Sequence, residues 1–356
     1  MEYRREDILL SGMLKKERML FTDISHIKKV DAPAVDVWMP DGDYSFVHEA
    51  AVIKYHGTLF ASWYNCPKIE LLGDTPIRER RSTDGGKTWS EVKVIARDET
   101  EAILYCPPVY GICNDKLYLF LNEMVSADHI HSLDLYVYDE AESVFRLLRK
   151  TALPFKLNTN VVMLSDGKLV LPGRMAPALD EFPNIPSLLI CDSGNIEGEW
   201  RLVTIQKDCL LPDGEKLVHP ELTLIENDKT LYMFSRDDLR RVPLVYVSKD
   251  MGETWDTVHE HNIPFSSSKI YGGTLSDGRN YLIGCLTEQR RELVLFLSEK
   301  GTMRFTDALL LADASMQSGT AFHYPFAFDD GTTLYIVYTV SLDGGRGIRM
   351  TAYHYV

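Results

Sequence analysis

An eight-residue motif that occurs twice constrains the fold of this chain more than any other feature. The segment STDGGKTW at residues 82–89 recurs as SKDMGETW at residues 248–255, and both fit the pattern S-x-D-x-G-x-T-W. In such a turn the aspartate accepts backbone N–H hydrogen bonds, the glycine permits positive φ, and the tryptophan packs between neighbouring units. A motif that repeats in this way favours a repeat architecture over two unrelated domains.

Short β-rich runs fill the sequence around these motifs. Each run is rich in Val, Ile, Tyr and Phe and is often joined to the next by an Asp-Gly or Asn-Asp pair, as in VVMLSDGKLVLPG and LTLIENDKTLYMF. Runs of four to eight such residues between turn pairs are typical of strands in hairpins. Only the first ~20 residues carry a pattern that could form a helix. The sequence therefore predicts an all-β fold.

The spacing of the motifs predicts the number of repeats. They start 166 residues apart (248 − 82), and we expect two weaker copies, one ending near Trp200 and one spanning Ser298 to Phe305. Six blades in 356 residues give roughly 59 residues each, so 166 residues correspond to about three blades. We predict one six-bladed β-propeller of four-stranded antiparallel blades over residues 1–356. Residues 1–30 would be a lead-in segment that closes against the last blade, so that the chain ends meet in one blade.

Composition and charge argue against several classes of partner. Thirty-eight basic residues against 52 acidic ones give a net charge of −14, without the concentrated basic face that nucleic acid binding needs. No apolar run approaches the ~18–20 residues of a membrane-spanning helix. The N-terminus lacks the features of a signal peptide, so we expect a cytoplasmic protein. The six cysteines are scattered without metal-ligand spacing, and we expect neither a metal nor a cofactor.

The two motifs and the ordered strands resemble the sialidase-like superfamily, in which the motif is known as the Asp box or BNR repeat. The resemblance covers nearly the whole chain, from HEAAVIKYHGTLFASWY through LNTNVVMLSDGKLVLPGR and HPELTLIENDKTLYMFSRD to FHYPFAFDDGTTLYIVYT. It implies a glycosidase. Retaining sialidases use a tyrosine nucleophile activated by a glutamate, an aspartate as acid/base, and three arginines that bind the substrate carboxylate.

The resemblance implies a role for ten residues of this sequence. Tyr324, in Phe322-His323-Tyr324-Pro325, would be the nucleophile and Glu221 its activating glutamate. The loop from Asn65 to Asp74 would supply the acid/base, and both of its acids, Glu70 and Asp74, qualify. The substrate-binding candidates are Arg236, one of Arg290 and Arg291, His48, Arg174 and Tyr271.

One part of the family pattern is missing. Sialidases open with an Arg-Ile-Pro motif that supplies the first arginine of the triad, but the corresponding segment here reads Phe46-Val47-His48-Glu49-Ala50. No arginine occurs between Arg18 and Arg78. His48 would stand in its place, and a single histidine binds an anion more weakly and only when protonated. We therefore predict weak or absent cleavage of sialic acid conjugates.

These observations point to an exo-acting glycoside hydrolase whose partner is a short oligosaccharide that can be acidic. The reaction would retain configuration if Tyr324 is the nucleophile, or invert it if a pair of carboxylates acts instead. Two alternatives stay open. One is a lyase that acts on a uronate with His48, His219 and His323 near Tyr324, and the other is a non-catalytic sugar-binding propeller. The sugar and the oligomeric state do not follow from the sequence.

Overall fold

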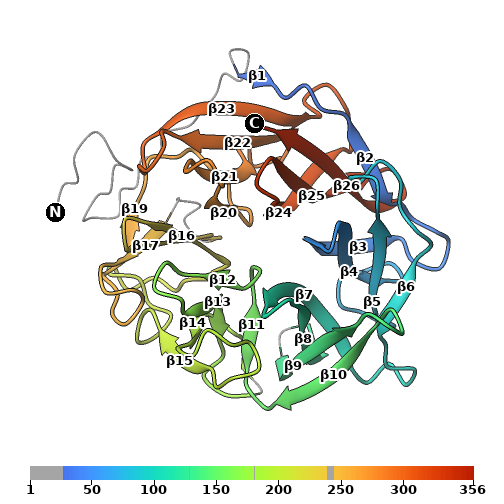
Figure 1. Cartoon of the computed structure of the whole chain (residues 1–356), viewed down its shortest axis with the longest axis horizontal. Coiled ribbons are helices and arrows are strands. Elements are labelled where there is room, and N and C mark those ends of the chain that lie inside the picture. The colour runs from blue at the N-terminus through green and yellow to red at the C-terminus, as the bar shows by residue number, and fades with distance from the viewer. Residues whose placement is uncertain (1–26, 128, 180, 239–243) are drawn as a thin grey trace.

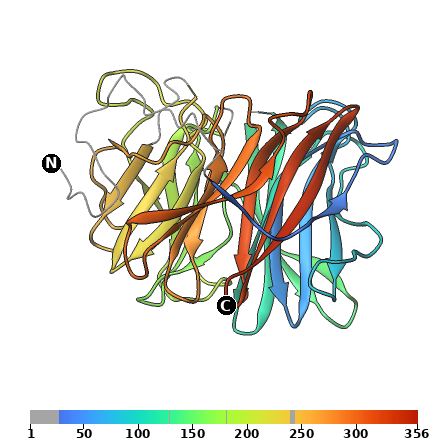
Figure 2. The same cartoon turned by 90° about the horizontal axis from the view of Figure 1, so that it is seen from above.

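The computed structural model describes residues 27–127, 129–179, 181–238 and 244–356. Within these ranges every regular element is a β-strand, and there is no helix that could cross a membrane. Six sheets stand around a central axis (Figure 1), with their strands running through the thickness of the disc (Figure 2). The prediction of an all-β six-bladed propeller is confirmed. The helix considered for the first ~20 residues falls outside the described residues.

Each blade is built on a meander of consecutive antiparallel strands, with the first strand of the meander nearest the axis. Blade one contains β3 (Phe46–Tyr55), β4 (Thr58–Cys66), β5 (Ile77–Ser82) and β6 (Lys93–Ala96). Blade two contains β7 (Leu104–Cys113), β8 (Lys116–Ser126), β9 (His129–Asp139) and β10 (Val144–Thr151). Blade three contains β11 (Phe155–Leu157), β12 (Val162–Met163), β13 (Leu169–Met175), β14 (Ile185–Cys191) and β15 (Arg201–Thr204).

The other three blades complete the ring. Blade four contains β16 (Leu222–Asn227), β17 (Thr230–Ser235), β18 (Leu244–Ser248) and β19 (His259–Glu260). Blade five contains β20 (Tyr271–Thr274), β21 (Asn280–Cys285), β22 (Glu292–Ser298) and β23 (Phe305–Asp313), with β1 (Lys28–Lys29) added at its outer edge. Blade six contains β24 (Ala321–Asp329), β25 (Thr333–Leu342), β26 (Gly345–His354) and β2 (Ala34–Trp38).

The ring is closed by strands from both ends of the described chain. Strand β2 pairs with β26 in blade six, with Ala34 opposite Thr351, so an early strand is the outermost strand of the last blade. Strand β1 instead pairs in parallel with β23 of blade five. Residues 1–26 of the expected lead-in segment lie outside the described residues. The described part of the lead-in segment, at residues 28–29, therefore contacts blade five and not the last blade. Residues 34–38 complete blade six.

The Asp boxes occupy the same place in their blades, the turn between the third and fourth strands. Residues 82–89 join β5 to β6 in blade one, and residues 248–255 join β18 to β19 in blade four. The weaker copies near Trp200 and at Ser298 to Phe305 lie at this place in blades three and five. In the first box Asp84 Oδ1 accepts hydrogen bonds from the N–H groups of Lys87 and Thr88, each at 3.0 Å. The 166-residue spacing thus spans three blades.

Two neighbouring glycines of the first box allow a matched test of inter-blade packing. Gly85 and Gly86 have φ of 76° and 86°, but only at Gly86 would an added Cβ collide with another blade, 1.9 Å from Cε of buried Met350. Gly85→Ala should therefore cost only the backbone strain, about 1–2 kcal/mol. Gly86→Ala should cost about 1 kcal/mol more, because Met350 must move within a packed core. Urea unfolding measures both, and equal losses would contradict this packing account.

Irregularities near the start of the inner strands aim side chains at the axis. The pairing register shifts between His48 and Ala51 in blade one and between His323 and Phe326 in blade six. Glu49 and Tyr324, which lie inside these bulges, have φ of 48° and 49°. Bulges re-aim side chains, and residues held at positive φ gather at functional sites. The bulges thus mark one end of the central axis as the candidate site.

Candidate active site

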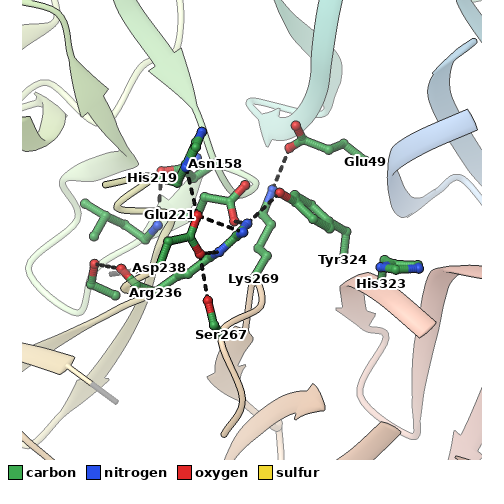
Figure 3. A network of polar contacts seen from close by, with 12 residues as sticks. Glu49, Asn158, His219, Glu221, Arg236, Asp238, Ser267, Lys269, His323 and Tyr324 are labelled. Atoms are coloured by element: carbon green, nitrogen blue, oxygen red, sulfur yellow. Dashed lines mark hydrogen bonds and ion pairs between the residues drawn. The ribbon is translucent and has the colours of Figure 1, made fainter. Parts of the chain in front are cut away.

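Side chains from blades one, three, four, five and six meet at this end of the axis (Figure 3). Arg236, which follows β17, links the two main catalytic candidates. Its Nη1 atom lies 2.7 Å from Oε2 of Glu221 and 2.8 Å from the hydroxyl oxygen of Tyr324. Glu221 directly precedes β16, and Tyr324 lies in the bulge of β24. The structure therefore brings Tyr324, Glu221 and Arg236 into one contact network.

A second carboxylate, which the sequence reasoning missed, fixes Arg236 from the other side. Asp238 accepts from Nε at 2.5 Å and from Nη2 at 3.0 Å, a bidentate arrangement that sets the plane of the guanidinium. It also accepts hydrogen bonds from Ser267 Oγ at 2.7 Å and contacts His219 Nδ1 at 2.8 Å. Burial opposes the ionisation of Asp238, but these partners outweigh it and hold its pKa below the ordinary value. Asp238 is a positioning residue for Arg236.

Lys269 and Glu49 form a buried ion pair beside Tyr324 that the sequence reasoning also missed. Lys269 Nζ lies 2.8 Å from Glu49 Oε2 and 5.3 Å from the centre of the Tyr324 ring. The Lys269 side chain is 1% exposed. A signal was present in the sequence, because Lys269 stands just before the inner strand of its blade, much as Glu221 does. Glu49 is the residue after His48, and the bulge turns it towards the axis.

The surroundings of Tyr324 keep its phenol protonated in the free protein. Burial raises the pKa of Tyr324 well above 10, and the charges of Glu221, Glu49 and Glu70 raise it further, while Arg236 acts in the opposite direction. The residue as a whole is nevertheless partly exposed, so a ligand can reach it. As a nucleophile this phenol needs a base for its proton and a cation beside its oxygen. Glu221 and Arg236 offer these two functions.

His48 does not provide the cationic contact expected in place of the missing arginine. Its ring packs against Tyr324 with the ring centres 3.9 Å apart, and its Nδ1 lies 3.2 Å from Thr339 Oγ1. Burial lowers the pKa of His48 well below 6.5, and the nearby charges of Arg346, Arg290 and Lys269, together with His323, lower it further. The imidazole is therefore neutral near pH 7. The expectation of a protonated, pH-dependent anion contact was wrong because it assumed the pKa of an exposed histidine.

This correction predicts how ligand binding responds to pH. A histidine whose pKa lies well below 6.5 is neutral around pH 7, so its protonation contributes nothing to anion binding near neutral pH. Affinity of the wild type for an acidic sugar, measured by titration calorimetry, should show no step near pH 6.5 that is due to His48. Wild type and His48→Gln should give parallel profiles around this pH. A pH step in wild-type affinity that disappears in His48→Gln would show instead that a protonated His48 binds the anion.

The structure separates the two acid/base candidates. Glu70 Oε1 accepts a hydrogen bond from the Tyr64 hydroxyl at 2.7 Å, and Glu70 is close enough to Tyr324 to influence its pKa. Although Glu70 is exposed as a residue, partial burial of its carboxylate raises its pKa, aided by Glu49 and opposed by the Tyr64 hydrogen bond. Asp74 instead contacts the Tyr44 hydroxyl and pairs with Arg97 at 3.0 Å. Of the two, Glu70 faces the network around Tyr324.

The remaining candidates divide between this site and other places. Arg290 contacts His323 Nδ1 at 3.0 Å and donates to the carbonyl of Ser267 at 2.8 Å, so it borders the site. Arg291 points away, towards the carbonyl of Ser315 at 3.5 Å. Tyr271 does not join the network. It is buried against Phe326 and lines a different cavity, of about 770 Å³, along the other half of the inner strands.

Charge at the site is opposite in sign to that of the whole chain. Five of the cations are Lys156, Arg174, Arg236, Lys269 and Arg290. The sixth is Arg346, whose charge acts on both His48 and Glu70. The carboxylates are Glu49, Glu70, Glu221 and Asp238. Six cations against four carboxylates leave a positive excess in a protein of net charge −14. In the described ranges no three His, Cys, Asp or Glu residues are grouped as metal ligands would be.

Six blades around one axis, with Asp boxes between the third and fourth strands, place this chain in the sialidase-like class of propellers. The chain belongs to the BNR repeat-like domain family, whose model matches residues 57–336. It is 32% identical over 130 residues to a sialidase from Micromonospora viridifaciens, a match that covers 36% of this chain and 19% of that protein. The matched region is thus less than a fifth of that relative's length.

Solved structures share the fold at low sequence identity. A protein of unknown function from Dyadobacter fermentans superposes with a TM-score of 0.73 at 13% identity, covering 92% of this chain and 99% of the other. The NanB sialidase of Streptococcus pneumoniae gives 0.68 at 12% identity, covering 90% and 70%. The sialidase of Trypanosoma rangeli gives 0.69 at 13% identity, covering 90% and 59%.

Proposed function

We propose that this protein is a retaining glycoside hydrolase whose nucleophile is Tyr324. The observation that carries the proposal is the position of Arg236 Nη1, which contacts both the Tyr324 oxygen at 2.8 Å and Glu221 at 2.7 Å. A guanidinium in this place stabilises the negative charge that develops on the phenol oxygen. Glu221, on the other side of the same nitrogen, accepts the phenol proton.

The reaction proceeds in two displacements. In the first, the Tyr324 oxygen bonds to the anomeric carbon while the glycosidic bond breaks, and Glu70 gives its proton to the leaving oxygen. In the second, Glu70 takes a proton from water, which attacks the anomeric carbon and releases Tyr324, and the Tyr324 oxygen regains its proton from Glu221. The raised pKa of Glu70 suits the acid role, since a higher pKa favours the protonated form that donates the proton.

The substrate we propose is an acidic sugar other than sialic acid. The positive excess at the site supports an anionic ligand, because buried cations gain most from a ligand that supplies the missing charge. His48, which stands in the place of the missing arginine, is neutral, and the nearby cation Lys269 is already neutralised by Glu49 at 2.8 Å. Such a pair offers a sialic acid carboxylate little net attraction. We therefore retain the prediction of weak or absent sialidase activity.

Glu70 and Asp74 provide a direct test of the acid/base assignment. Glu70→Gln should lower kcat by roughly 10²–10⁴-fold on substrates with poor leaving groups, the usual contribution of a general acid. The loss should be much smaller on nitrophenyl glycosides, whose leaving group needs no proton. Asp74→Asn should lower kcat less than tenfold, about 1.4 kcal/mol in the barrier, because its carboxylate is engaged by Tyr44 and Arg97. The reverse ranking would assign the role to Asp74.

A substrate screen tests the proposed function itself. Wild type and Glu221→Gln are assayed side by side on chromogenic glycosides of neutral sugars, uronic acids, sulfated sugars and sialic acid. We expect turnover of an acidic member other than sialic acid and its loss in Glu221→Gln. Release of an unsaturated sugar, seen by its ultraviolet absorbance, would show a lyase instead. Binding of these sugars without turnover of any would leave a non-catalytic propeller.

A further inference from the structure

Two cationic side chains stand directly opposite each other in blade three, inside the protein. Lys156 on β11 pairs with Arg174 on β13 in the antiparallel register, so both side chains project from the same face of the sheet. They are 4% and 6% exposed. Like charges directly opposite on a sheet destabilise it, and burial removes the water that would screen them.

Neither cation has a carboxylate within ion-pair distance in the described ranges. Lys156 Nζ contacts the Cys106 carbonyl at 3.2 Å, Cys106 Sγ at 3.1 Å and Met124 Sδ at 3.0 Å. Arg174 lies 5.4 Å from the centre of the Phe182 ring, and among the described residues its Nε and Nη1 atoms have no hydrogen-bond partner. By contrast, Arg236 and Lys269 each pair with a carboxylate. The fold alone does not account for the charge at Lys156 and Arg174.

The position of the two cations connects them with the active site. The charge of Arg174 helps to lower the pKa of Glu221, and the charge of Lys156 partly offsets the rise in the pKa of Glu70, so both act on this end of the axis. In a ring of six, blade three stands opposite blade six, which carries Tyr324 (Figure 1). A sugar whose anomeric carbon faces Tyr324 turns the far side of its ring towards blade three.

Building on the proposed function, we infer that Lys156 and Arg174 form a subsite for an anionic group on the far side of the sugar ring from the anomeric carbon. The group is a carboxylate or sulfate ester, both of which suit a guanidinium fork beside an ammonium. A uronic acid or a sugar sulfated on a remote hydroxyl carries its charge there. Sialic acid carries its carboxylate on the anomeric carbon itself, next to Tyr324. This placement accounts for both unpaired cations and names the substrate class.

The test measures binding without turnover, in the Tyr324→Phe background. Calorimetric titrations use glucuronate, sulfated galactose with the sulfate at O6, inorganic sulfate, and glucose as the neutral probe. Arg174→Gln and Lys156→Met should each weaken the acidic probes by roughly tenfold to a hundredfold, the usual effect of losing a hydrogen bond to a charged group. Arg174→Lys should recover part of that loss. Arg201→Gln is the matched control, because Arg201 pairs with Asp192 and Glu253 at 2.6 Å on the outer turns.

Thermal unfolding without ligand gives a second, independent readout. Lys156→Met should leave the Tm unchanged or raise it, since it removes one of two opposed buried charges, whereas Arg201→Gln should lower it slightly. Unchanged affinities in Arg174→Gln and Lys156→Met, or no binding of any acidic probe by the parent, would overturn the subsite. A large fall in Tm for Lys156→Met would also overturn it, by revealing a structural partner. None of these outcomes would affect the proposed hydrolysis, which the substrate screen tests separately.

Discussion

Tyr324→Phe should abolish hydrolysis while leaving the fold intact. Removing the hydroxyl deletes the attacking oxygen, and loss of a covalent nucleophile lowers kcat by roughly 10⁴-fold or more in enzymes of this kind. Among the described residues the phenol oxygen makes one hydrogen bond, with Arg236, and after its loss Arg236 keeps Glu221 and Asp238 as partners. The Tm should therefore change by only a few degrees. Steady-state kinetics on the best member of the screen measures the loss.

Tyr271→Phe is the matched control for this substitution. Tyr271 is also buried near the axis, but it lines the second cavity and takes no part in the network around Tyr324. Its replacement should leave kcat within about threefold of wild type, a change of less than ~1 kcal/mol in the barrier. Equal losses in the two variants would indicate a general packing effect. Near wild-type turnover by Tyr324→Phe would remove the tyrosine from the mechanism.

Glu221→Gln should lose both activity and stability. Burial opposes the charge of Glu221, but Arg236, Lys269 and Arg174 outweigh this effect and keep its pKa below the usual value. Neutralising it takes away the proton acceptor of Tyr324, for which we expect a fall in kcat of roughly 10²–10⁴-fold. It also leaves Arg236 with Asp238 alone. Removing one partner of a buried ion pair lowers the free energy of unfolding by about 3 kcal/mol, and by less where a second carboxylate remains.

The stability effect of Glu221→Gln has a defined pH dependence. A carboxylate whose folded-state pKa is lowered stabilises the protein above its unfolded-state pKa, and the contribution is lost as pH falls through the folded-state value. The difference in unfolding free energy between wild type and variant should thus be full at pH 7 and shrink below about pH 4. Glu199→Gln, a surface substitution with the same charge change, is the control. A difference that grows towards acid pH would contradict the ionised Glu221.

The fold could be predicted because its signals are local. The Asp boxes at 82–89 and 248–255 need only the residues within one turn, and their spacing counts blades without knowledge of the contacts between them. Tyr324, Glu221 and Arg236 were also found, because each lies at a fixed place in a blade that resembles known ones. The structure shows that these three are in contact.

The rest of the site depends on properties that a single sequence does not display. Glu49 and Lys269 are 220 residues apart, and their pairing follows from ring closure and from the bulge that turns Glu49 inward. The neutral state of His48 follows from burial among cations that come from other blades. The expected role of Tyr271 was misplaced because its position along the axis depends on the register of β20.

The most direct test of the central claim is the configuration of the first product. Proton NMR of the reaction on the best acidic glycoside, recorded before the anomers equilibrate, shows which anomer is released first. Attack by Tyr324 followed by attack of water predicts retention of configuration. Inversion would contradict the account and point to two carboxylates that act on a water molecule, with a separation of about 6.5–9.5 Å.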